Sequence, residues 1–284
     1  MIALIFDGIV LGLQFGLLAA GLTLIYGLGG VLNMAYGQTA VIAAMVVAFS
    51  MDAGIPMLPA IGLGLLAGGI VGLILDLTIL RPVFRLRGEA RVLLSLLLTL
   101  GVSFIIDGFL TWRFPLKALS LHIGGAIEIL GVPMRRGSLL ASAITLVTFA
   151  LLFIFFRYTT PGQAVRSVIE DEEGSKLVGI DPRKMLRFIL VLSGILAALV
   201  AVTRSMVSPV DVHSGLSITV FALIVTVVGG LGNVAGALLA GIILGIVNVV
   251  AADFIGSYIS LIILLGAAAV TILVRPAGLL GVKE

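Results

Sequence analysis

The sequence predicts an all-α polytopic membrane protein, one whose chain crosses the bilayer several times as helices. Hydrophobic residues make up 61% of the 284 residues, charged residues only 11%, and the mean hydropathy is +1.31. A soluble domain cannot bury that much apolar surface. The apolar residues form long continuous runs, whereas a membrane-spanning β-strand would alternate apolar and polar residues over about ten positions. We therefore expect helices rather than a barrel.

The uncharged runs predict about eight or nine transmembrane helices. The first run, Gly8 to Met51, is long enough for two crossings, because a helix rises about 1.5 Å per residue and the hydrocarbon layer is about 30 Å thick. Val92 to Trp112 is interrupted only by Asp107. The remaining runs are Ala53 to Leu75, Gly137 to Phe156, Phe188 to Thr203, Ser214 to Ala252 and Phe254 to Val274.

The basic residues predict how the helices are oriented. Of the 17 lysines and arginines, 12 lie in three places that the positive-inside rule assigns to the cytoplasm. These are Arg81, Arg85, Arg87 and Arg91; Arg157, Arg166, Lys176, Arg183, Lys184 and Arg187; and Arg275 with Lys283. With nine helices, the amino terminus is then outside. Four bases oppose the rule and either meet a partner or are simply solvated: Arg113, Lys117, Arg135 and Arg136.

Two glycine pairs interrupt the apolar runs. Gly29 and Gly30 precede Asn33, Tyr36 and Gln38, and 200 residues later Gly229 and Gly230 precede Asn233. A glycine pair frees the backbone from a regular helix, which a membrane tolerates only where protein or a wet cavity binds the freed groups. These eight positions therefore predict either breaks that line a solute pathway or tight hairpins with ordinary caps. By the orientation above, the two segments would form a parallel internal repeat.

Other small and polar residues inside the runs have structural explanations. Glycines that recur every four residues, such as Gly64, Gly68 and Gly72, allow close helix packing. Asp76 and Arg204 lie near the ends of runs and are expected to reach the interface. Asp107 lies deepest among the acids, and it either has a mechanistic role or is a structural acid bound by a neighbour.

The segment from about 157 to 187 is the only long one with the composition of a soluble loop. Thr160 before Pro161 starts a short helix whose apolar ridge is Val165, Val168 and Ile169. Acids from Glu170 and Asp171 onward mark the start of a second helix, and Gly179 marks its end. An exposed ridge beside Arg166 suits insertion into a groove on a partner protein. Lipid headgroups are the alternative surface, which the acids disfavour.

Several function classes lack their usual residues. The chain has no cysteine and no Gly-Lys-Ser/Thr phosphate loop, and its two histidines, His122 and His213, are far apart in sequence. We therefore expect no metal site, no bound cofactor and no enzymatic activity in this chain. The net charge of +3 is explained by cytoplasmic loops and does not call for nucleic acid.

Three blocks carry a family resemblance. GLTLIYGLGGVLNMAYGQ, PGQAVRSVIEDEEGSKLVGID and VVGGLGNVAGALLAGIILGIV resemble conserved blocks of the permease subunits of bacterial branched-chain amino acid ABC importers, closest to the LivH type. The match spans nearly all of residues 1–284, which implies a single permease domain whose coupling loop is the segment at about 157–187. Ser167 and Gly174 depart from the family pattern, which more often has a small helix former and alanine there.

The resemblance implies a translocation subunit for leucine, isoleucine and valine in the bacterial cytoplasmic (inner) membrane. Its partners would be a second permease of the LivM type, two cytoplasmic ATPases that use ATP and Mg, and an extracytoplasmic solute-binding protein. Val165, Arg166, Val168, Ile169, Glu170, Asp171 and Gly179 would couple to an ATPase, and Arg135 and Arg136 would meet the binding protein. The alternatives are an ion-coupled secondary transporter that uses Asp107, or a passive channel for a small solute such as urea.

Overall fold

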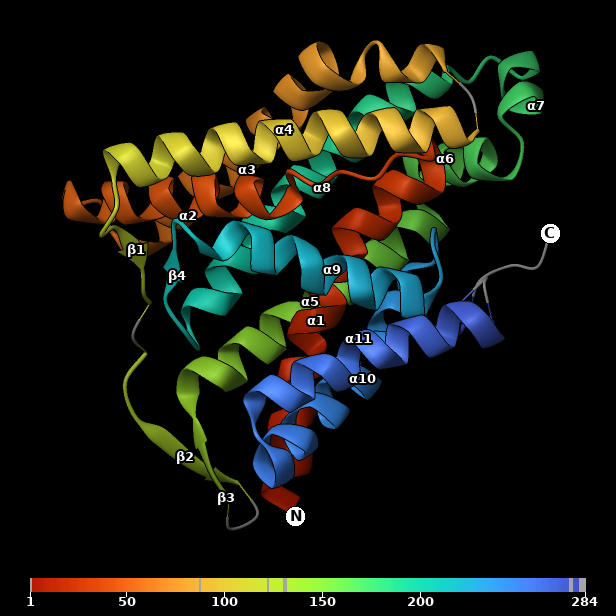
Figure 1. Cartoon of the computed structure of the whole chain (residues 1–284). Helices are drawn as coiled ribbons and strands as arrows, with labels where there is room; N and C mark the ends of the chain where they lie inside the picture. The colour runs from red at the N-terminus through yellow and green to blue at the C-terminus, as the bar shows by residue number, and fades with distance from the viewer. Residues whose placement is uncertain (1, 87, 122, 130–131, 276–277, 281–284) are drawn as a thin grey trace.

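The structure is a computed structural model that describes residues 2–86, 88–121, 123–129, 132–275 and 278–280 (Figure 1). Arg87, His122 and Lys283, named above, lie outside the described residues. The helices are α1 (Ile2–Gly29), α2 (Tyr36–Asp52), α3 (Met57–Leu75), α4 (Glu89–Arg113), α5 (Arg136–Tyr158), α6 (Thr160–Glu170), α7 (Glu172–Leu177), α8 (Pro182–Ser205), α9 (Ser214–Gly229), α10 (Val234–Ile255) and α11 (Ser257–Val274). Short strands are β1 (Ala118–Leu119), β2 (Ala126–Ile129), β3 (Val132–Arg135) and β4 (Val210–Asp211).

The described part of the chain is a multi-pass helical membrane protein. Six helices are long and apolar enough to cross a bilayer, namely α1, α3, α4, α5, α8 and α10. Three more, in α2, α9 and α11, are apolar but shorter. Every uncharged run of the sequence thus folds as one helix or as two, with the breaks inside the first run and inside the run that contains α9 and α10. The number of helices that actually cross the membrane stays a prediction.

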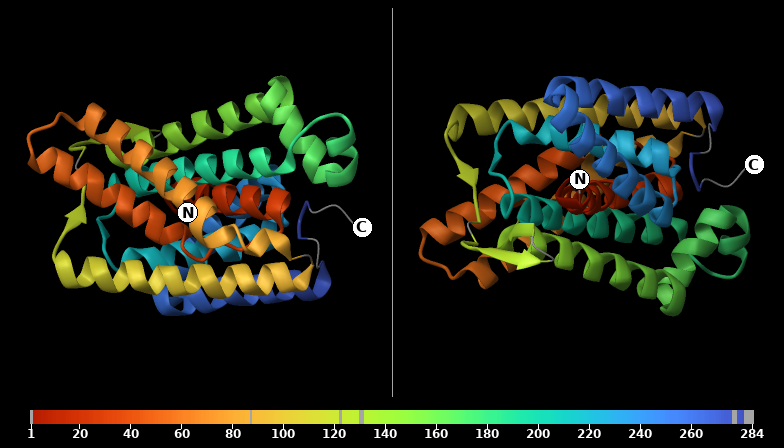
Figure 2. Two further views of the ribbon diagram at one scale, coloured as in Figure 1. Left: turned by 90° about the horizontal axis from the view of Figure 1, so that it is seen from above. Right: turned by 90° about the horizontal axis from the view of Figure 1, so that it is seen from below.

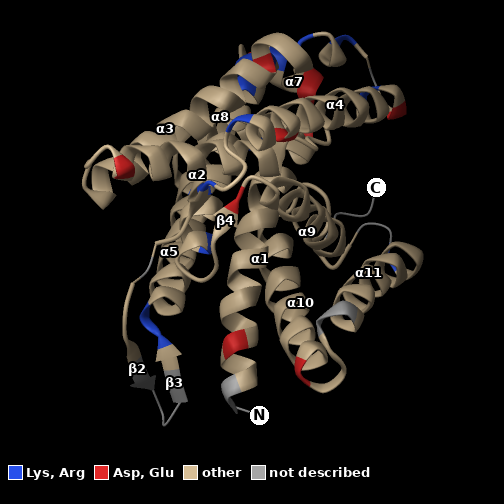
Figure 3. Ribbon diagram, turned by 60° about the vertical axis from the view of Figure 1, so that its left-hand side comes forward, with Lys and Arg blue, Asp and Glu red and all other residues tan. Residues whose placement is uncertain are grey.

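The two ends of the molecule differ. The short helices α6 and α7 lie at one end, which we call the loop end, and the β2–β3 hairpin with the β1–β4 pair lies at the other, the hairpin end (Figures 1 and 2). Helices that follow one another along the chain run between these ends in alternating directions. Figure 3 shows that most of the helix length carries no charge. This arrangement agrees with a membrane lying between the two ends.

Helix α1 lies at the centre and is enclosed by other helices (Figure 2). It packs along α10 through glycines: a side chain at Gly8 would meet the backbone of Ile246, and one at Gly12 would meet that of Gly241 and Ile242. The spacing of four residues keeps these glycines on one face. The predicted role of the glycine pattern in close packing is confirmed here.

The α3–α8 contact follows the same rule. Gly68 and Gly194 face each other so closely that a side chain on either would collide with the backbone carbonyl of the other. Gly72 likewise lies against the Leu190 carbonyl. By contrast, Gly62 on α3 has open space around it, so a glycine in this helix is not by itself a sign of contact.

Asp76 lies near the loop end and is buried within the protein. It begins a π-helical turn, Asp76–Leu80, that continues α3, and only 1% of the residue is exposed. Its carboxylate accepts a hydrogen bond from Nε of Arg187 on α8 at 2.9 Å. The ion pair provides the compensation that a buried charge requires, and it ties α3 to α8 near the loop end.

Candidate functional site

The connection between α1 and α2 is a break between two apolar helices. Gly30 has φ +56°, a value that suits glycine, and residues 30–35 are not helical. In Figure 1 this segment runs as an extended coil from the loop-end terminus of α1 to the start of α2, alongside α4. We call residues 30–35 the first break. At its two edges, the Gly30 amide bonds the Tyr26 carbonyl of α1 and the Ala35 carbonyl accepts from the Thr39 amide of α2, but the groups between them need partners elsewhere.

Hydroxyl groups from two other helices supply those partners. On α4, Ser95 Oγ accepts from the Leu32 amide at 3.2 Å, and Thr99 Oγ1 accepts from the Met34 amide at 2.9 Å. On α9, Thr219 Oγ1 accepts from the Gly37 amide at 2.9 Å and itself donates to the Met34 carbonyl at 3.3 Å. Ser95, Thr99 and Thr219 are completely buried. The first break is thus held in place by side chains from both flanks.

The polar residues that follow the first glycine pair lie together. Asn33 Oδ1 accepts from the Ala35 amide at 3.0 Å, which satisfies another freed group as the sequence suggested. Gln38 is buried, and its Nε2 donates to Asp107 Oδ1 at 3.2 Å, so Asp107 has a structural partner. Two atoms at this site have no hydrogen-bond partner among the described residues, the Tyr36 hydroxyl and Gln38 Oε1. A buried polar cluster with unused bonding capacity lies just beyond the first break.

The second glycine pair makes a tighter and more conventional turn. Gly230 has φ +106° and ends α9, and Asn233 caps α10 by accepting from the Gly236 amide at 2.9 Å. The Asn233 amide group also donates to the Leu280 carbonyl at 2.7 Å. Here the asparagine is an ordinary helix cap. The two segments therefore share a sequence motif but differ in backbone conformation, because the first is an extended break and the second a short turn with a helix cap. The parallel repeat stays a prediction.

Arg91 connects the first break to the loop end. Its Nη1 donates to the Gly29 carbonyl at 3.1 Å and its Nε donates to the Leu86 carbonyl at 2.8 Å. A cation is favourable at this position, because the carbonyls at the end of α1 carry the negative end of the helix dipole. The guanidinium also lies 6.0 Å from the ring centroid of Phe84. The start of α4, the turn before it and the end of α1 are thereby joined.

Helix α6 forms as predicted but presents a different face. Its cap is Thr159, whose hydroxyl accepts from the Gly162 amide at 3.2 Å, rather than Thr160. Val165 and Val168 are 0% and 5% exposed, because they pack against the body of the protein. The expectation of an exposed ridge is therefore wrong for these two residues. The spacing of apolar residues identified the apolar face of the helix correctly, but it did not show that this face is covered by the rest of the same chain. Arg166, Ile169 and Glu170 are exposed.

Helix α7 presents apolar residues to solvent. Asp171 caps it by accepting from the Glu173 and Gly174 amides at 3.0 and 2.9 Å. The helix ends at Leu177, and Val178 is its C-cap; these residues are 90% and 74% exposed, and Gly179 follows with φ +85°. We call Leu177, Val178 and Gly179 the α7 tip. Exposed apolar groups of this kind mark interaction surfaces.

Two family-atypical residues shape the turn between α6 and α7. The hydroxyl of Ser167 bonds that of Ser175 at 2.7 Å, which ties the two helices together. At Gly174 a side chain would collide with the capping carboxylate of Asp171.

Within α7, hydrogen bonds with Glu173 and then Glu172 raise the pKa of Lys176, so this side chain is positively charged at neutral pH.

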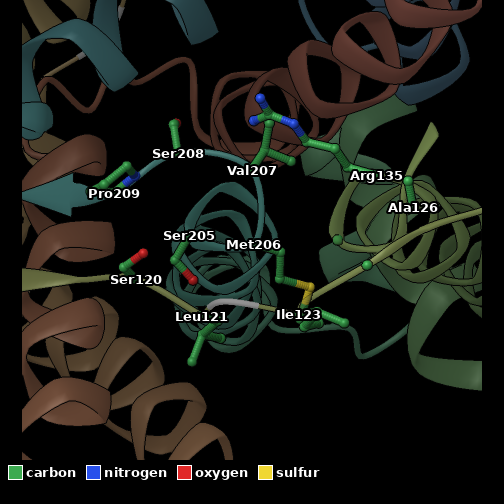
Figure 4. A pocket seen from close by; sticks show the side chains of 12 residues that line it. Ser120, Leu121, Ile123, Ala126, Arg135, Ser205, Met206, Val207, Ser208 and Pro209 are labelled. Carbon is green, nitrogen blue, oxygen red and sulfur yellow. The ribbon is translucent and has the colours of Figure 1, made fainter. Parts of the chain in front are cut away.

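A cavity of about 370 Å³ lies at the hairpin end, between the hairpin and the connection from α8 to β4 (Figure 4). Arg135 lines it together with Ser120, Val207 and Ser208. The neighbouring Arg136 does not line this cavity; its guanidinium lies over Gly125, and its amide donates to the Gly125 carbonyl at 3.2 Å. Of the other outer bases, Lys117 pairs with Asp52. The two predicted docking residues are thus neighbours at the hairpin end, but Arg135 lines the cavity whereas Arg136 contacts Gly125.

Comparisons with known proteins place these features in context. A sequence model of the family described as branched-chain amino acid transport system / permease component matches residues 4–274. The chain is 25% identical to the high-affinity branched-chain amino acid transport system permease protein LivH of Escherichia coli, over 81% of this chain and 79% of that one. It is 28% identical to the corresponding protein BraD of Pseudomonas aeruginosa, over 98% and 95%.

More distant matches carry other names. Import permeases for fructose, galactofuranose and ribose are 24%, 26% and 27% identical, and the chain spans less than two thirds of each. Among solved structures, a chain of PsaBC from Streptococcus pneumoniae in complex with Fab has a TM-score of 0.52 at 15% identity, covering 96% of this chain and 92% of that one. That likeness concerns the fold alone.

Proposed function

Because this chain belongs to the family of permease components of branched-chain amino acid transport systems, we propose that it forms the pathway for leucine, isoleucine and valine in an ATP-driven importer. It acts in the bacterial cytoplasmic (inner) membrane, next to a second permease of the LivM type. Two cytoplasmic ATPases, which use ATP and Mg, bind at the loop end. A solute-binding protein delivers the amino acid at the hairpin end, where Arg135 and Arg136 face it.

The first break is the observation that supports a pathway most strongly. Six consecutive residues leave helical geometry in an apolar environment, and hydroxyls of α4 and α9 hold them. Non-helical backbone inside a membrane protein is tolerated where other protein groups or a water-filled cavity supply its hydrogen-bond partners. The Tyr36 hydroxyl and Gln38 Oε1 are unpaired beside the break and can serve the polar ends of a passing amino acid. Gly29, Gly30, Asn33, Gly229, Gly230 and Asn233 form the two turns of this pathway.

The relatives that align over most of their length support branched-chain amino acids as the cargo. BraD and LivH align over most of their own length and carry branched-chain amino acid names, whereas the sugar permeases align over less. A ribose-like sugar is the competing cargo. Uptake of labelled leucine, with unlabelled isoleucine, valine or ribose as competitor, distinguishes the two: inhibition by ribose but not by isoleucine would assign the chain to sugars.

The class of transport is tested in vesicles that hold the complete transporter. With ATP inside and the binding protein outside, leucine should accumulate, and an ionophore that collapses ion gradients should leave the rate unchanged. Accumulation without ATP that stops when the gradient collapses would identify a secondary transporter coupled at Asp107. Equilibration without accumulation in any condition would identify a passive channel.

ATPase docking is assigned to the α7 tip. Asp171 and Gly179 set the shape of this surface through the cap and the turn. Changing both Leu177 and Val178 to Asp should reduce the copurified ATPase about tenfold or more, because an apolar anchor is replaced by charge. Leu116→Asp is the matched control, since Leu116 is 97% exposed at the hairpin end. Wild-type ATPase yield in the double variant would place the docking surface elsewhere.

A further inference from the structure

A groove on the flank of the protein has the shape and charge of a lipid site. It has a volume of about 750 Å³ and lies between α1, α5, α6 and the start of α10. Its wall is apolar, with three aromatic rings from α5, those of Phe149, Phe153 and Phe156, opposite Leu238 of α10. Its charged lining residues are Arg166 and Glu170, both on α6. The groove is thus an apolar channel with a charged mouth at the loop end.

The groove is open to the bilayer. It runs along α5, and several residues of this helix are exposed: Leu146, Leu151 and Phe153 are 52%, 61% and 62% exposed. In a helix that crosses the membrane such residues face acyl chains or another membrane helix. Because α5 ends at Tyr158 and α6 begins at Thr160, the mouth lies where the membrane-crossing segment gives way to the surface helix. That level is where headgroups lie.

The charges at the mouth favour an anionic occupant. Arg166 is exposed by 56% of its side chain, and Glu170, 3.8 Å away, offsets its charge only weakly. Arg157 adds a second guanidinium, 5.9 Å from the ring centroid of Phe153, which is a groove residue. Two cations and one acid therefore surround the mouth. Basic side chains at the cytoplasmic end of grooves between membrane helices bind lipid phosphates.

We propose that this groove binds an anionic phospholipid, with an acyl chain along the α5 rings and the phosphate between Arg157 and Arg166. The inference rests on membrane insertion and not on the proposed cargo. The groove also includes Gly232 and Asn233, from the turn between α9 and α10, together with residues of α6. A lipid there contacts both that turn and the helix that leads to the α7 tip. Its affinity depends on their spacing, so binding and movement of these elements are coupled.

The test uses the whole chain alone in lipid discs, because this chain has a single tryptophan. In a Trp112→Phe background, Phe156→Trp reports from inside the groove, and Ile154→Trp on the same helix reports from outside it. Brominated phosphatidylglycerol should quench the Phe156→Trp signal at an about fivefold lower mole fraction than brominated phosphatidylcholine, as expected for one net positive charge near the surface. Ile154→Trp should show no headgroup preference.

Variants of the mouth separate charge recognition from general lipid contact. Arg157→Gln with Arg166→Gln should remove the preference at Phe156→Trp, and Glu170→Gln should increase it. Equal quenching by the two headgroups in the unmodified groove would overturn the proposal. Quenching of Ile154→Trp but not of Phe156→Trp would overturn it as well, because the groove would then be filled by another membrane helix.

Discussion

Removing one hydroxyl from α4 tests whether the first break depends on bonds from outside. Thr99→Val keeps the shape of the side chain but removes the acceptor of the Met34 amide and leaves that donor inside the protein without a partner. It also removes a weaker donation to the Leu32 carbonyl at 3.3 Å. Thr99→Ser keeps the hydroxyl and serves as the rescue variant.

The size of the effect follows from the bonds lost. A buried amide without a partner costs about 1–3 kcal/mol, and the Met34 amide is partly buried, so we expect about 2 kcal/mol of lost unfolding free energy. Thr148→Val on α5 is the matched control, because that hydroxyl donates only to the Ile144 carbonyl of its own helix. The control should stay within about 0.5 kcal/mol of the wild type.

Denaturant unfolding in detergent, followed by loss of helical signal, measures both variants. Thr99→Val should unfold at a clearly lower denaturant concentration than Thr148→Val, and Thr99→Ser should recover most of the difference. The same order is expected for transport rates in vesicles, since the break lies on the proposed pathway. Identical midpoints for Thr99→Val and Thr148→Val would refute the view that α4 hydroxyls hold the break.

Three other predictions follow from the described contacts. Gly68→Ala should destabilise the protein by about 1–3 kcal/mol, because the added methyl group collides with α8, whereas Gly62→Ala should be close to neutral in the same unfolding assay. Asp107→Asn should retain ATP-driven uptake, since an amide oxygen still accepts from Gln38, while a proton-coupled carrier would lose uptake. The pKa of Lys176 is raised above its ordinary 10.5, so its ion pairs are fully formed below that value and are lost as the pH rises through the raised pKa. Trypsin cleavage after Lys176 should therefore proceed at a constant rate between about pH 7 and 9, once the pH dependence of trypsin itself has been subtracted.

The sequence predicted the path of the chain well, because that information is local. Uncharged runs and glycine pairs fix where helices begin and end, and both breaks occur at the expected glycines. The acids that begin α7 and the glycine that follows it were also correctly identified. In each case, neighbouring residues determine the structure through capping or backbone freedom.

Tertiary partners were harder to predict. Ser95 and Thr99 lie more than 60 residues from the backbone that they bind, and nothing in the local pattern identifies that distant segment. A usable signal was present, because Ser95, Thr99, Ser103 and Asp107 recur every four residues and so share one face of α4. Val165 and Val168 illustrate the converse difficulty: an amphipathic period identifies an apolar face, but whether the same chain or a partner covers that face depends on the whole fold. The paired strands at the hairpin end were likewise not foreseen.

The central position of α1 has a consequence for biosynthesis. This helix leaves the ribosome before α10, which covers its glycine face and emerges more than 200 residues later. During that interval Gly8 and Gly12 must face lipid or the insertion machinery, and the nascent chain lacks the contact that will fix its core. The contact between α1 and α10 can therefore form only after α10 has been synthesised. A chain cut short before α10 should be degraded rather than accumulate in the bilayer.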